Sequence, residues 1–206
     1  MVLAEKKLEF DEQVERPWDR REAFVAISPS GEVPVLVELG GTALSDSTAI
    51  CEYLDETTRE PPLLPTDSLE KAEVRRLVGW FDAKFHADVT LGLVGEKVIK
   101  RLAASRAEPD SRLIRSAFSA IHEHLDYVGW LTERRTWLAG AQFSMADIAA
   151  AAQLSCIDYM GDVPWDKHPG AKDWYARVKS RPSFRPLLAD HLPGVPPPKH
   201  YADLDF

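Results

Sequence analysis

The sequence predicts an α/β unit followed by an all-helical bundle. Two short apolar runs on either side of Gly40-Gly41 indicate a hairpin of strands in the first third of the chain. After residue 67, every periodic segment has the spacing of a helix. The proline-rich stretch at 59–65 cannot remain helical and is typical of a linker. We therefore expect a unit at 1–58, a linker at 59–67, a bundle at 68–191 and a proline-rich tail at 192–206.

The first unit is expected to mix helices with strands. Leu8, Phe10 and Val14 alternate with polar residues, which suits a half-exposed strand. The expected elements are the end of a helix at 2–7, a strand at 8–15, a short helix at 19–26 that Asp19 could cap, strands at 33–39 and 43–44, and a helix at 47–57.

The bundle is expected to contain five helices, of which the first is very long. Leu77, Trp80, Phe81 and Phe85 recur at helical spacing and are predicted to form either core or the seam of a dimer. The expected helices cover 68–106, with Gly92 or Gly95 as places where it could bend, and then 109–135, 144–159, 171–180 and 183–191.

Composition argues against several classes of function. A formal charge of −8 and a pI of about 5.3 argue against a general nucleic-acid binder. The apolar runs fall short of the ~18 residues of a membrane span, and no signal peptide is visible, so we expect a cytoplasmic protein. Cys51 and Cys156 are predicted to be reduced core thiols. His122 and His124 face different sides of their helix, so no metal site is expected.

Two dipeptides of the first unit are candidate binding residues. Pro34 after Val33 is either a simple strand-entry proline or, with a cis bond, a place where the Val33 backbone turns outward and pairs with an extended peptide. Asp46-Ser47 at a helix start is either an ordinary N-cap or an anion site, in which free N–H groups and the Ser47 hydroxyl hold a carboxylate.

In combination these residues resemble the glutathione transferase superfamily. The resemblance rests on Val33-Pro34-Val35-Leu36, the two-glycine hairpin, Asp46-Ser47, Ile50-x-x-Tyr53-Leu54 and the segment Phe143-Ser144-Met145-Ala146-Asp147-Ile148. It implies a thioredoxin-like first domain without its first strand, and a glutathione site formed by Val33, Pro34, Asp46 and Ser47. Glutathione is then a possible ligand but not a required cofactor. The resemblance also implies a structural capping box in which Ser144 caps a helix and Asp147 reaches back.

The superfamily's catalytic Tyr, Ser or Cys precedes the first helix, and no residue of this sequence matches it, so no catalytic residue is predicted. One hypothesis from this resemblance is nevertheless a glutathione transferase that conjugates glutathione to small electrophiles.

A narrower resemblance connects the chain with an alphaproteobacterial branch whose members are FtsZ-localised. It rests on five segments: 15–21, 92–98, 124–130, 161–165 and 198–206. It implies a non-enzymatic homodimer at the bacterial division site that binds FtsZ filaments and favours curved ones. The partner-binding residues would be Trp18 and Asp203. Two alternatives remain open: Trp18 packs against the bundle, and the amphipathic tail docks on the protein's own surface.

Overall fold

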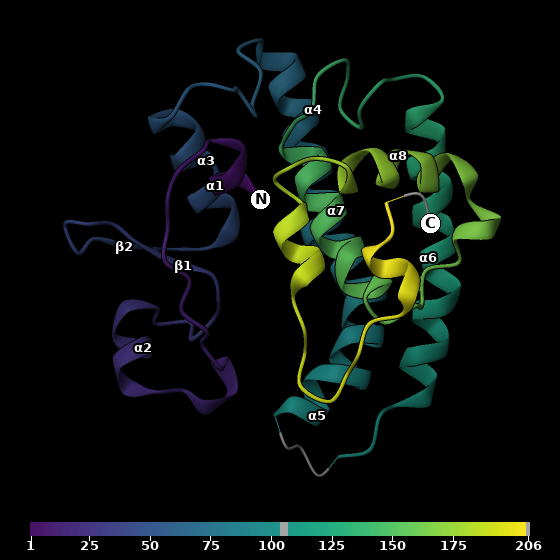
Figure 1. Cartoon of the computed structure of the whole chain (residues 1–206), viewed down its shortest axis with the longest axis horizontal. Helices are drawn as coiled ribbons and strands as arrows, with labels where there is room; N and C mark the ends of the chain where they lie inside the picture. The colour runs from purple at the N-terminus through teal and green to yellow at the C-terminus, as the bar shows by residue number, and fades with distance from the viewer. Residues whose placement is uncertain (104–106, 205–206) are drawn as a thin grey trace. The chain divides into compact units, whose positions relative to one another are not determined.

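A computed structural model describes residues 1–103 and 107–204 of the chain (Figure 1). The chain divides into two compact units, one at Val2–Leu64 and a second that begins at Pro65. Each is described by itself below. Most of the regular structure is helical, and the described residues hold one short two-stranded sheet.

The first unit combines short helices with a hairpin. Its elements are α1 (Val2–Glu5), the 3₁₀ helix η1 (Pro17–Asp19), α2 (Glu22–Ile27), β1 (Val35–Val37), β2 (Ala43–Ser45) and α3 (Ser47–Thr57). The strands are antiparallel, with Leu36 opposite Leu44. Gly41, at φ +85° in the connecting turn, adopts a conformation that glycine reaches without steric cost.

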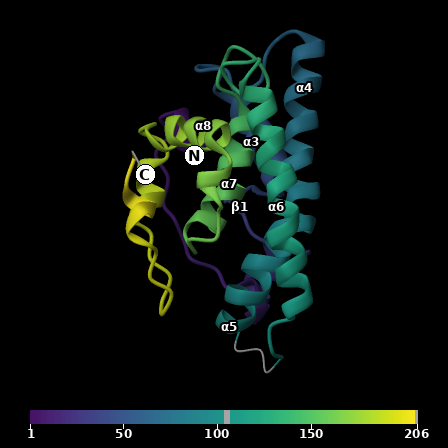
Figure 2. The same cartoon turned by 90° about the vertical axis from the view of Figure 1, so that its right-hand side faces the viewer.

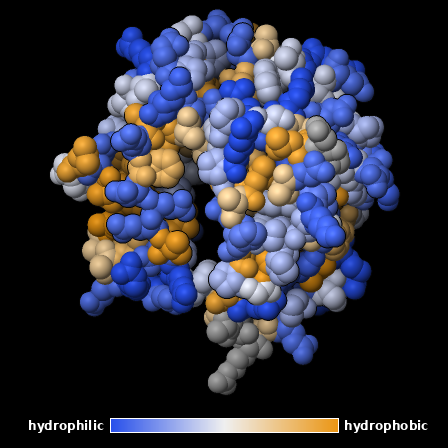
Figure 3. Space-filling view, in the orientation of Figure 1, coloured by the Kyte–Doolittle hydropathy of each residue, from blue (hydrophilic) through white to orange (hydrophobic). Residues whose placement is uncertain are grey.

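The predicted strand at 8–15 is wrong. These residues have no regular structure, and Phe10 and Val14 are exposed. The alternating pattern is present, but in the described part of the chain the sheet consists of β1 and β2 alone. Without a third strand to pair with, the backbone of 8–15 has no ladder to join. Apolar surface on this unit is visible in Figure 3.

The predicted helix at 19–26 also differs in its start. Asp19 ends the 3₁₀ turn η1, and α2 begins at Glu22 with Arg21 at its N-cap position and no side-chain cap bond.

A buried lysine holds the end of the first unit against α3. The Lys6 ammonium contacts the Asp55 carboxylate and donates to the carbonyl oxygens of Thr58 (2.7 Å) and Pro61 (2.6 Å). Asp55 in turn accepts from the backbone N–H groups of Leu63 (2.8 Å) and Leu64 (3.1 Å). This ion pair therefore joins α1, α3 and the chain that leaves α3.

The second unit is a helical bundle. Its elements are α4 (Ser68–Gly79), η2 (Trp80–Ile99), α5 (Lys100–Leu102), α6 (Ser111–Thr132), α7 (Met145–Asp158), η3 (Trp165–Lys167), α8 (Pro169–Lys179), η4 (Arg185–Ala189) and η5 (Lys199–Ala202). Helix α7 packs against α4, η2 and α8. Figure 2 shows α4 and α6 on one side of the unit and the C-terminal residues (yellow) on the other, beyond α7 and α8.

The long first helix of the bundle changes its winding. It is α-helical through Gly79, but η2 is a π-helix, in which Lys100 N–H reaches back five residues to Gly95 O. A π-helix holds more residues per turn than the 3.6 of an α-helix. The buried Phe81, Phe85, Val89 and Leu93 are spaced four apart along this helix. The helix expected at 68–106 is therefore present but has π winding over residues 80–99, and its expected end at 106 lies outside the described residues.

The predicted last helix at 183–191 is also different. The structure places a short 3₁₀ helix, η4, within that range.

Gly92 permits the closest approach between two helices. A Cβ atom on Gly92 would lie 2.6 Å from Ala117 Cβ and 2.9 Å from Leu113 O of α6, too close for real contacts. A Cβ atom on Gly95, on the same helix, would meet nothing within 4 Å. Thus Gly92 is required by packing, whereas Gly95 is not.

We expect Gly92→Ala to lower the free energy of unfolding by about 1–3 kcal/mol, because the overpacked contact forces η2 and α6 apart. Gly95→Ala is the matched control and should be neutral or stabilising by up to about 1 kcal/mol. Urea denaturation measures both. Equal effects of the two substitutions would contradict the close approach.

Candidate functional site

The hairpin brings the candidate glutathione residues together. Val35 is paired with Ser45, so Val33-Pro34 and Asp46-Ser47 lie next to one another at the end of the ladder. The Val33–Pro34 peptide bond is cis. All four residues are exposed and therefore accessible to a ligand.

The start of α3 is held in an unusual backbone conformation. Asp46 has φ +78° and ψ 123°, a region that residues other than glycine rarely adopt. Its carboxylate caps the helix by accepting from Ala49 N–H at 2.9 Å. The N–H groups of Ser47 and Thr48 belong to the first turn, which has no intrahelical acceptors. Strained residues of this kind cluster at ligand sites, so the geometry suits a small anion.

Trp18 lies at the tip of a turn in the first unit. The turn is closed by hydrogen bonds from Asp19 N–H to Arg16 O (3.0 Å) and from Arg20 N–H to Pro17 O (3.3 Å). Glu15 and Arg21 form an ion pair at its base, and this contact lowers the pKa of Glu15. The Trp18 side chain is 36% exposed. The turn therefore presents a partly exposed indole between two arginines.

Asp203 lies at the end of a tail that docks on the bundle. Tyr201 is 3% exposed, and its hydroxyl is 2.9 Å from the Ser155 hydroxyl while its ring meets Tyr159 edge-on. His200 Nε2 is 3.2 Å from Asp158 Oδ1 at the end of α7. Asp203 itself is exposed. For the tail, the structure thus shows the alternative in which it docks on the protein's own surface.

The docked tail covers two buried charged residues, Asp158 and Lys179. Asp158, 0% exposed, also accepts from Trp165 Nε1 at 2.8 Å, and its Oδ2 faces the Lys179 ammonium at 3.8 Å. Burial raises the pKa of Asp158, and the bond from Trp165 and the charge of Lys179 oppose this. Burial likewise lowers the pKa of Lys179, against the nearby charges of Asp158 and Asp203. Sequence reasoning missed this pair, since neither residue belongs to a recognisable motif.

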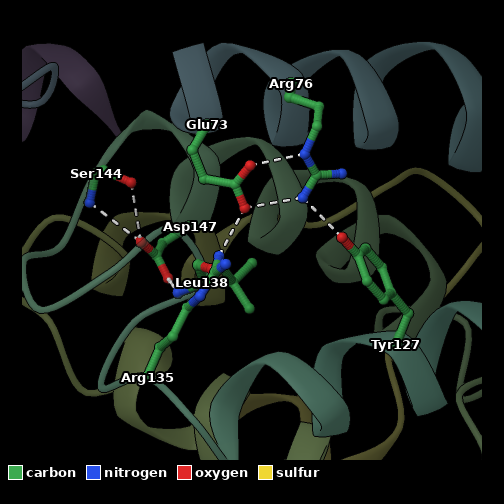
Figure 4. Close-up of polar contacts among 7 residues, drawn as sticks. All are labelled: Glu73, Arg76, Tyr127, Arg135, Leu138, Ser144 and Asp147. Atoms are coloured by element: carbon green, nitrogen blue, oxygen red, sulfur yellow. Dashed lines mark hydrogen bonds and ion pairs between the residues drawn. The ribbon is translucent and has the colours of Figure 1, made fainter. Parts of the chain in front are cut away.

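Ser144 and Asp147 form the capping box of α7 (Figure 4). Asp147 Oδ2 accepts from Ser144 N–H at 3.1 Å, while Ser144 caps the helix start. Asp147 Oδ1 accepts from Leu138 N–H (3.0 Å) and Trp174 Nε1 (2.9 Å). Burial raises the pKa of Asp147, and these hydrogen bonds oppose the rise. The box is a folding element without exposed chemistry.

An ion network extends from this box to α4 and α6 (Figure 4). Glu73 accepts from Arg76 at 2.7 and 2.9 Å and from Arg135 at 2.7 Å. Arg76 also donates to the Tyr127 hydroxyl at 2.7 Å, and Arg135 to Leu138 O at 2.9 Å. Hydrogen bonds from Arg76 and then Arg135 lower the pKa of Glu73 to about 2.

Among residues 1–103 and 107–204, no group of three or more His, Cys, Asp or Glu side chains is placed to hold a metal ion. Over the same residues, no helix has the length and apolar character needed to cross a membrane.

Comparison with known proteins identifies the family. Residues 1–57 match the model of the glutathione S-transferase N-terminal domain, and residues 81–182 match that of the C-terminal domain. FtsZ-localized protein A of Caulobacter vibrioides is 48% identical over 100% of this chain and 91% of its own length. The chain belongs to the glutathione S-transferase superfamily.

Solved structures of the superfamily agree. A glutathione S-transferase from Rhodospirillum rubrum F11 is 55% identical with a TM-score of 0.97, covering 100% of this chain and 92% of that one. The structure of FzlA from C. crescentus has a TM-score of 0.95 at 48% identity, with the same coverage. In this glutathione S-transferase-like protein, the hairpin residues, the Trp18 turn and the docked tail are thus the candidate sites.

We expect Glu73→Gln to lower the free energy of unfolding at pH 7 by about 1–2 kcal/mol, because two charge-assisted contacts are lost. The folded-state pKa of about 2 lies below the unfolded value near 4.5. The advantage of the wild type is therefore fully present above pH 4.5 and is lost as the pH falls toward 2. Urea denaturation of both proteins across this range measures it. A stability difference that does not depend on pH would contradict the role of the Glu73 charge.

Proposed function

We propose that this chain is a non-enzymatic glutathione S-transferase-like protein that binds FtsZ filaments at the division site and promotes their curvature during constriction. The observation that carries the proposal is 48% identity, over the whole chain, to FtsZ-localized protein A. Trp18 and Asp203 are the proposed filament-contacting residues.

The Trp18 turn has the chemistry of an interface anchor. Tryptophan and arginine dominate the energetics of protein–protein interfaces, and here a partly exposed Trp18 stands between the exposed Arg16 and Arg20. The closed turn and the Glu15–Arg21 pair order the backbone around Trp18 before binding, which reduces the entropy lost on association.

Glutathione chemistry receives less support. A transferase needs a group that stabilises the glutathione thiolate. The Tyr53 hydroxyl, on α3, donates a hydrogen bond to Glu38, which raises the pKa of that hydroxyl. A tyrosine held as a donor to a carboxylate is poorly suited to stabilise a second anion.

Replacing Trp18 by alanine should weaken binding to GTP-assembled FtsZ by at least about tenfold, the loss typical of an interface hot spot. Co-pelleting at increasing filament concentration measures the affinity, and electron microscopy of the pellets reports curvature. Phe10→Ala is the matched control, because Phe10 is an exposed aromatic residue of the same unit outside the proposed contact. Equal pelleting by the Trp18 variant and the wild type would remove this turn from the interface. A wild type that does not pellet would overturn the proposed function.

The strained Asp46 favours a second candidate function, the binding of glutathione. If the chain binds glutathione, calorimetry should detect that binding. Ser47→Ala should then weaken the affinity for glutathione about five- to tenfold by removing one hydrogen bond. Thr42→Ala, outside the site, serves as control. Turnover of a chromogenic electrophile by the wild type would support the transferase, and an absence of both heat and turnover would reject this candidate.

The homodimer also remains a proposal. The ring centroids of Trp80 on η2 and Tyr127 on α6 lie 4.7 Å apart. The neighbouring Trp130 is 49% exposed. Such an aromatic face suits a second copy of the chain. Sedimentation at micromolar concentration would show twice the 23.1 kDa monomer mass if the proposal holds, and the monomer mass if it does not.

A further inference from the structure

A lysine inside the bundle holds the C-terminal tail by its main chain. Lys179, at the end of α8, is 0% exposed. Its ammonium donates to the carbonyl oxygens of His200 at 3.3 Å and Asp203 at 2.7 Å. Because both acceptors are backbone atoms, the contact determines where the tail runs. The two acceptor residues flank Tyr201 in the sequence, and the centroid of the Tyr201 ring lies 5.9 Å from the Lys179 ammonium.

The Lys179 site is built from two helices of the bundle. Asp158, at the end of α7, balances the charge of the lysine at 3.8 Å and contacts His200 from the other side. A buried ammonium without such partners would be strongly destabilising. The tail therefore supplies hydrogen-bond acceptors to the Lys179 ammonium, which the bundle already buries. Docking of the tail is in this way coupled to the charge of Lys179.

We propose that Lys179 is a positioning residue for partner binding: by holding the main chain of residues 200–203, it presents Asp203 and Leu204 at a fixed place on the bundle surface. The inference rests on the proposed function, in which the partner is an FtsZ filament. Lys179 is buried and does not itself touch the filament. A tail without this anchor would lose conformational entropy on binding and would bind more weakly.

The anchor also changes how Asp203 should be tested. Burial lowers the pKa of Lys179, and the charges of Asp158 and Asp203 oppose that effect. Asp203→Lys would bring a second cation to Lys179 and loosen the tail, so loss of binding in that variant would not separate direct contact from positioning. Asp203→Asn disturbs the anchor less, because it removes one favourable charge and adds no repulsion.

The variant that tests the anchor is Asp158→Asn combined with Lys179→Met. Lys179→Met alone leaves a buried carboxylate without its cation, whereas the double variant removes both charges and keeps similar shapes.

Chymotrypsin cleavage after the buried Tyr201, followed by mass spectrometry, reports opening of the tail. Cleavage should accelerate by about tenfold or more, as expected for lost charge-assisted hydrogen bonds. Circular dichroism should show a folded bundle. Lys71→Met, at a half-buried lysine of α4, is the control and should cleave like the wild type.

Co-pelleting with FtsZ then separates positioning from a general structural effect. The double variant should pellet several-fold less well than the wild type. In a chain that lacks residues 199–206, the same two substitutions should have no further effect, because Lys179 acts through the tail. An equal loss with and without the tail would overturn the proposal, as would unchanged cleavage, or faster cleavage with unchanged pelleting. If the wild type fails to pellet, the proposed function fails and this role with it, while the cleavage rates still show whether Lys179 anchors the tail.

Discussion

Asp147 accepts hydrogen bonds from three separate parts of the bundle: its own helix start, the Leu138 segment and Trp174 of α8. Removal of this buried carboxylate would leave those donors unsatisfied, so the geometry of α7 and α8 depends on it. These two helices carry Asp158 and Lys179 at their far ends, and the tail docks there. A folding element without exposed chemistry thus determines where the candidate partner surface lies.

In both units of the chain, a buried lysine paired with an aspartate holds a segment that returns to the unit. In the first, buried Lys6 pairs with Asp55 and donates to two carbonyl oxygens of the segment that leaves α3. In the second, buried Lys179 faces Asp158 and donates to two carbonyl oxygens of the tail. A lysine suits this purpose because its ammonium has three donors at the end of a long apolar stem. Each lysine thereby holds the returning segment through backbone oxygens, and in the tail the side chains of His200 and Tyr201 add further contacts.

Local chemistry explains what the sequence could predict. The helix at 47–57 and the start of the helix after Ser144 follow from capping residues and apolar spacing, which act within a few residues. The prediction of a strand at 8–15 was wrong because an alternation of apolar and polar residues does not tell whether a neighbouring strand exists. The Lys179–Asp158 pair joins residues more than 20 positions apart, which no local pattern reports. Of the candidate site residues, the hairpin places Val33-Pro34 beside Asp46-Ser47, whereas the docking of the tail required the folded bundle.

Hydrogen–deuterium exchange of this chain, alone and with GTP-assembled FtsZ, would test the central claim most directly, because it reports contact along the backbone without any substitution. The account predicts slower exchange in the presence of filaments at two segments, the Trp18 turn (16–20) and the docked tail (198–204). Unchanged exchange at both segments would contradict the account. Protection restricted to the hairpin and the start of α3 would move the interface to the glutathione residues.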